Sequence, residues 1–380
     1  MLLSKNQRVL AVVESPFEAD PRILMFHQRL DGYAATDLVS LPDLAAELGI
    51  GALFVKHEAE RYGLPAFKML GASWAVYRAV CDLAGEEPEW DTFDELATMW
   101  QPLLPLRLAA ATDGNHGRAV ASMARRMGFS ASIWVPIGTA AARISSIEAE
   151  GATVTVVDGT YDDAVAVAAL EADEHTLVIS DTSWEGYRLV PTWVIDGYST
   201  ILREIDGQLK DLDVEPDVVF VQLGVGALGA AFVTHFKAAA GGPIIIGVEP
   251  DDANCVMAAI DANEIVTVPG PHTSHMVGLN CGTASPLAFP VLRDGLDAVV
   301  GICDSDAFTA MRAYADNGLV SGETGASGLG ALMALAREGR LAEVGIGPDS
   351  TVLVINTESA TDPENYLRVV GKAPEQVAAS

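Results

Sequence analysis

Residues 64–73 read LPAFKMLGAS and place one cation, Lys68, in an apolar run that leads into a predicted helix over residues 72–83. Lysine is scarce in this chain, and only six of the 23 basic residues are lysines. Packing of the neighbouring apolar side chains would remove water from the amine, which favours its neutral form, and a neutral amine can condense with an aldehyde. The alternative is a lysine at a helix start whose ammonium group reaches solvent. Lys68 is therefore the first candidate catalytic residue.

Beyond residue 107, apolar runs rich in valine and isoleucine alternate with helical patterns. Such alternation is typical of a parallel sheet with helices on both faces. We therefore predict the α/β class, with two αβ units that share one cleft and bind ligands at the carboxyl ends of their strands. One long helix is predicted over residues 191–209. The predicted strands cover residues 52–56, 108–112, 131–136, 153–158, 176–181, 218–222, 244–249, 298–303 and 351–357.

Charge and composition argue against several classes of protein. The net charge of −29, from 52 acidic and 23 basic residues, repels nucleic acids and anionic membranes. No apolar run reaches the roughly 18 residues that span a bilayer, and the first residues lack a secretory signal pattern. The cysteines have no metal-ligand spacing, so we expect reduced thiols, no metal site and a cytoplasmic location. A pair between Cys255 and Cys281 is sterically possible, but nothing in the sequence favours it.

The glycine-rich turn at residues 224–229 reads GVGALG, follows a predicted strand and begins a helix. Its backbone N–H groups and the helix dipole suit a phosphate. The turn also matches the dinucleotide pattern G-x-G-x-x-G, and Glu249 ends the next strand, where it would meet a ribose. NAD is therefore an alternative cofactor. That pattern normally lies on the first strand of its domain, whereas here it lies deep in the chain, so we favour another phosphate-bearing cofactor.

Polar side chains follow two further strands near the predicted cleft. In the turn DGNHG at residues 113–117, the Asn115 amide is suited to bond a ring oxygen of a cofactor, and the Asp113 carboxylate to accept a proton. The alternative is that either side chain serves only as a helix cap. Asp181 ends another predicted strand, and we expect its carboxylate to face the same cleft.

Two later turns complete the set of candidates. Glu323, in a glycine-rich turn, is suited to orient a substrate or a ring, and Thr357 or Ser359 to donate to a pyridine nitrogen. An imine-forming lysine, a phosphate cradle, a ring-oxygen donor and spare carboxylates together fit pyridoxal phosphate (PLP). Its aldehyde takes the lysine, and its ring stores the electrons of a broken Cα–H bond.

These motifs are similar to those of the fold-type II (tryptophan synthase β-like) PLP enzymes, and within them to the diaminopropionate ammonia-lyase family. The resemblance extends in family order from about residue 30 almost to the end of the chain. The strings DGNHG and DTxWEGY are specific to this branch, whereas the lysine motif alone would also admit dehydratases. The matching segments are residues 63–71, 111–118, 181–187, 191–193, 197–200, 278–282, 321–323, 356–358 and 361–363.

The resemblance implies an architecture of two three-layer αβα domains with mostly parallel sheets and the cofactor in the cleft between them. A large PLP-binding domain would comprise residues 1–78 and 183–380, and a small αβ domain, residues 79–182, would be inserted into it. The family resemblance also implies a homodimer that acts on a small amino acid.

The resemblance further implies removal of the β-amino group of 2,3-diaminopropionate, giving pyruvate and ammonia. Lys68 would form the imine with PLP, and Asn115 would contact the ring oxygen. Asp181 would take the α-proton of the L-isomer and Asp113 that of the D-isomer, because each face of a planar imine needs its own base. The phosphate would be held by Gly224, Val225, Gly226, Ala227 and Gly229.

Three alternatives stay open at the level of sequence. A serine, threonine or hydroxyaspartate dehydratase would use the same cofactor, an oxidoreductase would bind NAD at the glycine-rich turn, and a silent binding protein would retain PLP without turnover. Two departures from the family pattern bear on the choice. Where the family often has two glycines and a tyrosine after the lysine motif, this chain has Gly71, Ala72, Ser73 and Trp74, and Ser359 replaces a glycine.

Overall fold

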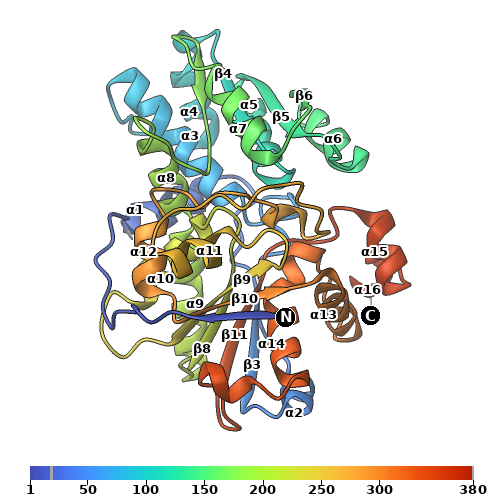
Figure 1. Cartoon of the computed structure of the whole chain (residues 1–380). Helices are drawn as coiled ribbons and strands as arrows, with labels where there is room; N and C mark the ends of the chain where they lie inside the picture. Colours follow the sequence, from blue (N-terminus) through green and yellow to red (C-terminus); the bar gives the residue numbers. More distant parts are fainter. Residues whose placement is uncertain (18–19, 379–380) are drawn as a thin grey trace.

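The computed structural model describes residues 1–17 and 20–378 and contains two β-sheets (Figure 1). The larger sheet has seven strands in the order β1-β10-β9-β8-β11-β3-β2, in which only the edge strands β1 and β2 are antiparallel to their neighbours. These strands are β1 (Leu2–Lys5), β2 (Leu38–Ser40), β3 (Ala52–His57), β8 (Val218–Gln222), β9 (Ile244–Pro250), β10 (Ala298–Ile302) and β11 (Thr351–Asn356).

The smaller sheet is parallel throughout and has the strand order β6-β5-β4-β7. It lies above the larger sheet in Figure 1 and falls within the segment predicted as an insertion. The exact limits of that insertion, residues 79–182, stay a prediction. The strands are β4 (Arg107–Ala111), β5 (Ser130–Pro136), β6 (Thr153–Val157) and β7 (Thr176–Val178).

Helices cover both faces of each sheet, as the α/β class predicts. Along β8, Val219 and Val221 pack in one hydrophobic cluster, while Val218 and Phe220 pack in the cluster on the other face. Alternate side chains of a strand point to opposite faces, so both faces of this strand are buried. The small sheet is layered in the same way, because alternate residues of β4 pack with α5 on one face and with α7 on the other.

One predicted helix differs clearly from the structure. The single helix predicted over residues 191–209 is two helices, which meet at Tyr198. The helices of the large part are α1 (Pro21–Arg29), α2 (Pro42–Leu48), α3 (Met69–Ala84), α8 (Leu189–Gly197), α9 (Ser199–Leu212), α10 (Ala227–Phe236), α11 (Cys255–Ala262), α12 (Phe289–Gly295), α13 (Asp304–Asp316), α14 (Glu323–Arg337), α15 (Pro363–Val370) and α16 (Pro374–Ala378). The remaining helices are α4 (Phe93–Met99), α5 (Asn115–Met127), α6 (Ala141–Glu148) and α7 (Tyr161–Ala169), and the short 3₁₀ turns are η1 (Gln101–Leu103), η2 (Val277–Leu279) and η3 (Leu341–Val344).

Close packing of α3 on α8 explains the break at Tyr198. A Cβ atom at Gly71 would lie 2.5 Å from the Tyr198 ring, and one at Gly197 would lie 2.6 Å from the Leu70 carbonyl oxygen. The two backbones therefore approach each other through glycines, which also weaken a continuous helix at this point. The Tyr198 ring is left packed on Phe67, directly beside Lys68.

The order of the strands gathers the predicted site at one edge of the large sheet. β11 lies between β8 and β3, and all three are parallel. Their carboxyl ends therefore lie side by side. The lysine segment follows β3, the glycine-rich turn follows β8, and Thr357 follows β11. Three segments that are far apart in the sequence thus meet in one cleft.

Candidate active site

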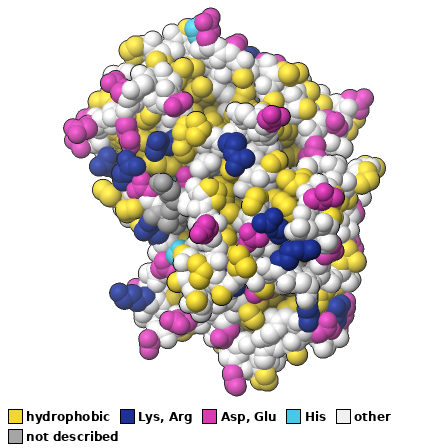
Figure 2. All heavy atoms as spheres, turned by 60° about the vertical axis from the view of Figure 1, so that its left-hand side comes forward, with side chains coloured by type: hydrophobic (Ala, Val, Ile, Leu, Met, Phe, Trp, Pro, Cys, Tyr) yellow, Lys and Arg dark blue, Asp and Glu magenta, His cyan; other side chains and the backbone are white. Residues whose placement is uncertain are grey.

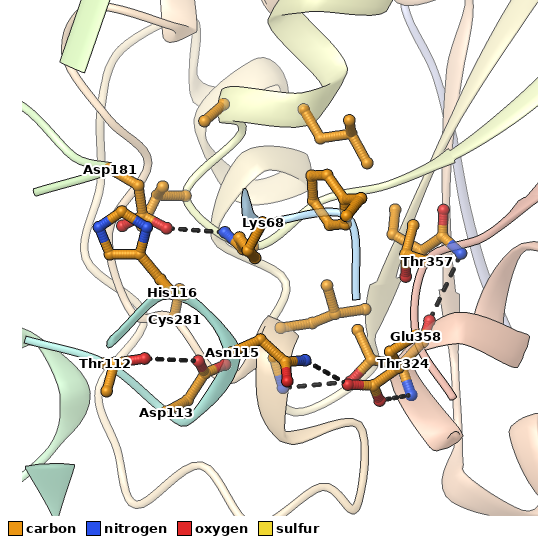
Figure 3. A pocket seen from close by; sticks show the side chains of 18 of the residues that line it. Lys68, Thr112, Asp113, Asn115, His116, Asp181, Cys281, Thr324, Thr357 and Glu358 are labelled. Carbon is orange, nitrogen blue, oxygen red and sulfur yellow. Dashed lines mark hydrogen bonds and ion pairs between the residues drawn. The ribbon is translucent and has the colours of Figure 1, made fainter. Parts of the chain in front are cut away.

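Lys68 lies directly before α3, with its ammonium group in the cavity at this edge of the sheet. Its Nζ donates to Oδ2 of Asp181 at 2.7 Å (Figure 3). The other carboxylate oxygen, Oδ1, accepts from the Tyr161 hydroxyl, also at 2.7 Å. The rings of Phe67 and Tyr198 flank the ammonium group, with centroids 5.5 and 6.0 Å from Nζ. Lys68 therefore faces the cavity and does not extend to the outer surface.

The ion pair decides the charge of both partners. Burial lowers the pKa of Lys68, but Asp181, Tyr198 and Asp113 together outweigh burial and hold this pKa above its ordinary value. Burial likewise raises the pKa of Asp181, but Lys68, His116 and the Tyr161 hydroxyl together hold the pKa below its usual range. The sequence-based expectation of a neutral amine is therefore wrong for the protein alone. The lysine is charged because its counter-ion is buried with it.

Asp113 is the second carboxylate in this cavity, and its proton equilibrium differs from that of Asp181. Burial raises its pKa to about 6, while the charges of Lys68 and Arg143 act in the opposite direction. Its Oδ1 is 3.5 Å from the Thr112 hydroxyl. Of these two aspartates, Asp181 is held in its ionised form and the pKa of Asp113 is about 6, a separation typical of acid–base sites.

Asn115 begins α5 and is bonded across the cleft. Its Nδ2 donates to Oε2 of Glu358 at 2.5 Å, and Oε1 of the same carboxylate accepts from the Thr324 backbone N–H at 3.1 Å (Figure 3). Glu358 is only 1% exposed. This carboxylate therefore connects the first residue of α5, which packs on the smaller sheet, to the first turn of α14, which packs on the larger sheet.

The glycine-rich turn has the geometry of an anion cradle. Gly226 has a φ of +99° and precedes the first turn of α10, whose N–H groups lack intrahelical acceptors. A Cβ atom at Gly224 would lie 3.0 Å from the Gly278 carbonyl oxygen. Four of the five predicted phosphate residues line the cavity, namely Gly224, Val225, Gly226 and Ala227. Gly229 instead packs against Leu223 and Leu292, and its predicted phosphate contact stays untested.

Thr357 supplies an unused polar group at the opposite end of the cavity. Its Oγ1 is buried and has no hydrogen-bond partner within the described part of the chain. Ser359, the alternative pyridine donor, lines a separate surface pocket with Pro65 and Arg118. Buried hydroxyl groups are usually hydrogen-bonded, so the orphaned Thr357 hydroxyl indicates a missing acceptor.

A comparison with protein families agrees with this arrangement. Residues 29–358 match the model of the family described as "Pyridoxal-phosphate dependent enzyme". The chain belongs to this PLP enzyme family. The residues present also fit its cofactor, because a lysine amine, a glycine cradle and the orphaned Thr357 hydroxyl face one cavity.

Similar proteins narrow the assignment within the PLP enzymes. The chain is 36% identical over 365 residues to diaminopropionate ammonia-lyase of Escherichia coli (strain K12), covering 93% of this chain and 91% of that protein. The crystal structure of holo diaminopropionate ammonia lyase from E. coli superposes with a TM-score of 0.90 at 33% identity, covering 100% of this chain and 98% of that one. A structure of that enzyme with an aminoacrylate-PLP azomethine reaction intermediate gives a TM-score of 0.88 at 32% identity, with the same coverage. The chain therefore belongs to the diaminopropionate ammonia-lyase family.

Glu249 contradicts the NAD alternative for this PLP enzyme. Its two carboxylate oxygens accept from the backbone N–H groups of Val256 and Met257 at 2.8 and 2.9 Å. The side chain is fully buried, and burial raises its pKa to about 8. Glu249 therefore caps the start of α11 and is not available to a ribose.

The cysteines of the described residues form no disulfide. Cys255 and Cys281 are free, buried thiols, and residues 1–17 and 20–378 contain no cluster of side chains suited to a metal ion. No helix in these same ranges is long and apolar enough to cross a membrane.

Sequence reasoning gave no role to Tyr161, Arg143 or Glu358. The first two lie in the small part, where the sequence pattern shows only ordinary helix positions. Glu358 carried a weak signal, since it is an acidic residue directly after a buried strand and was noted only within a family motif. All three act through contacts with residues far away in the chain.

Proposed function

We propose that this enzyme removes ammonia from 2,3-diaminopropionate and releases pyruvate. Elimination frees the β-amino group as ammonia, and water then converts the remaining three-carbon enamine to pyruvate and a second ammonia. The observation that carries the proposal is the pair of carboxylates, Asp113 and Asp181, beside a single lysine in one PLP-binding cavity. The names of the similar E. coli enzymes support the same substrate.

The first role in the reaction is the attachment of PLP. When bound, PLP links its aldehyde carbon to an amine and withdraws electrons from the neighbouring Cα–H bond. Lys68 would hold that aldehyde carbon, the glycine-rich turn would hold the phosphate, and Thr357 would donate to the pyridine nitrogen.

The second role is proton transfer at the substrate. Asp181 is ionised in the ion pair and is therefore ready to accept the α-proton of the L-isomer. Asp113 would accept the α-proton of the D-isomer, in the fraction of molecules in which it is ionised. The Lys68 ammonium is a charged proton donor in the same cavity, 2.7 Å from Asp181, so it would protonate the departing β-nitrogen.

Pyruvate release from purified holoenzyme tests this function. We expect pyruvate and ammonia in a ratio of one to two from L- and D-2,3-diaminopropionate, and none from Lys68→Ala. Activity on serine or threonine, with none on either diaminopropionate isomer, would show a dehydratase and overturn the substrate assignment. Failure of PLP to bind to the wild type would overturn the whole proposal.

We further propose that the enzyme is a cytoplasmic homodimer. Four free cysteines agree with a reducing compartment. Acidic side chains are spread over the face in Figure 2 and do not form one patch, and hydrophobic side chains lie between them. Light scattering after size-exclusion chromatography would measure the mass, and a monomeric mass would contradict the dimer.

A further inference from the structure

A second, wider cavity adjoins the cavity that contains Lys68. Its volume is about 770 Å³, and both cavities are lined by Asp113 and Tyr161. Its wall comes from α6 and the loop after β6 on one side, and from residues 270–280 and the start of α14 on the other. A small molecule bound in the wider cavity therefore reaches Lys68 past Asp113.

The wall of this wider cavity carries more acidic than basic side chains. Arg143 is the only permanently positive side chain among the described residues that line it. The acidic side chains are Asp113, Asp158, Glu323 and Asp362, and the two histidines are His272 and His275. The wall is therefore suited to a ligand that carries more positive than negative charge.

Arg143 is buried without an ion-pair partner. The residue is only 5% exposed, and its one hydrogen bond runs from Nη1 to the Asp113 carbonyl oxygen at a long 3.5 Å. Within residues 1–17 and 20–378, no carboxylate forms an ion pair with its guanidinium group. Gly114 gives its stem room, because a Cβ atom there would lie 3.3 Å from the Arg143 Cδ.

This placement leaves most of the guanidinium group free to bind a ligand. A guanidinium group has five N–H donors, and within residues 1–17 and 20–378 only the long bond from Nη1 to the Asp113 carbonyl oxygen uses one of them. Burial raises the pKa values of both Asp113 and Glu323, and the charge of Arg143 opposes this effect in each case. Arg143 thus lies near two carboxylates and pairs with neither. Its donors stay available to the cavity, in a planar fork that matches a carboxylate.

We propose that Arg143 binds the α-carboxylate of the substrate, and that Asp113 and Glu323 face its amino groups. The proposal rests on the proposed function and deepens it. It makes the wider cavity a filter for small amino acids with one carboxylate and two amines. Serine and threonine have only one amine, so they match the acidic part of the wall less well.

The test compares two diamines that differ only in the carboxylate. 2,3-Diaminopropionate and 1,2-diaminoethane are titrated into holoenzyme, and the change in the visible absorbance of PLP gives the Kd of each. In Arg143→Gln, we expect the Kd of diaminopropionate to rise about tenfold to a hundredfold, as for lost charge-assisted hydrogen bonds. The Kd of diaminoethane should stay within about twofold, because it has no carboxylate.

Matched variants make the result decisive. Arg143→Lys keeps the charge but not the fork, so it should weaken only diaminopropionate and by a smaller factor. If Arg143→Gln does not fold, Arg143→Lys is compared with the wild type in its place. Arg125→Gln, which removes a mostly exposed arginine paired with Glu150, should change neither Kd. Equal weakening of both diamines in the Arg143 variants, or no weakening, overturns the proposal. The wild type could still release pyruvate in that case, so the proposed function would survive.

Discussion

The Lys68 ammonium and the Asp181 carboxylate lie 2.7 Å apart, and each holds the other in its charged form. A protonated lysine cannot attack an aldehyde, because only the neutral amine is a nucleophile. The same contact that prepares Asp181 to accept a proton therefore delays the attachment of PLP to the free protein. This relationship leads to the first of five predictions.

Removal of the Asp181 charge should make PLP bind covalently at lower pH. In Asp181→Asn, burial lowers the pKa of Lys68 against less opposing charge, since Asp113 remains but Asp181 is gone, so more amine is neutral at a given pH. The formation of the visible PLP absorbance after mixing with apoprotein, measured across pH, should reach its half-maximal rate at a lower pH than in the wild type. An identical profile in both proteins would mean that Asp181 does not control the lysine.

The two carboxylates should separate the two isomers of the substrate. Asp113→Asn should reduce turnover of D-2,3-diaminopropionate by about 10²–10⁴-fold, the contribution of a general base, and spare the L-isomer. Pyruvate release from each isomer measures the effect. Asp181→Asn is the matched variant and should show the opposite selectivity, so a reversed pattern would exchange the two roles.

The pH dependence of the wild type gives an independent check on Asp113. A base accepts a proton only when it is ionised, and burial places the pKa of Asp113 at about 6. Turnover of the D-isomer should therefore fall as the pH decreases through about 6. Turnover of the L-isomer should not show this step, because the pKa of Asp181 lies below its usual range. A shared step in both profiles would assign it to another group.

Glu358 should act on PLP through Asn115. Glutamine has one acceptor oxygen in place of two, so Glu358→Gln cannot accept from both the Asn115 amide and the Thr324 N–H. We expect the Kd for PLP to rise about tenfold, the effect of one misplaced hydrogen bond. The double variant with Asn115→Ala should bind PLP no more weakly than Asn115→Ala alone. Additive losses would show that Glu358 stabilises the site independently of Asn115, and Glu171→Gln on the surface serves as the control.

The Thr357 hydroxyl should matter only when PLP is present. Thr357→Val keeps the side-chain shape and removes a buried hydroxyl that has no partner. The free energy of unfolding of the apoprotein should be unchanged or higher by up to about 1 kcal/mol, while PLP binds about tenfold more weakly. Denaturant melts and PLP titrations measure the two quantities. A loss of stability in the apoprotein would contradict the assignment, and Ser359→Ala should affect neither quantity.

Local sequence patterns were sufficient for the class of fold and for most of the cavity wall. Buried valine-rich strands followed by glycine or polar turns indicated where strands end, and those ends carry Lys68, Asn115, Asp181 and Thr357. The break at Tyr198 was missed, because it depends on the packing of α3 against α8 and not on local helix preference.

Charge states and long-range contacts could not be predicted from the sequence. The charge of Lys68 depends on Asp181, which is 113 residues away. Glu249 satisfied a spacing rule for NAD but is used to cap a helix. The contacts of Arg143 and Glu358 form only in the folded protein, so the sequence did not reveal their roles.

The position of β11 determines when the large sheet can be completed during synthesis of the chain. This strand lies between β8 and β3 in the middle of the large sheet, yet it is the last strand in the chain. A nascent chain that ends before residue 351 must therefore leave β8 and β3 unpaired along facing edges, where other strands can bind. Neither Thr357 nor Glu358 is yet present at that stage, so the proposed PLP site is complete only after residue 358 has been synthesised.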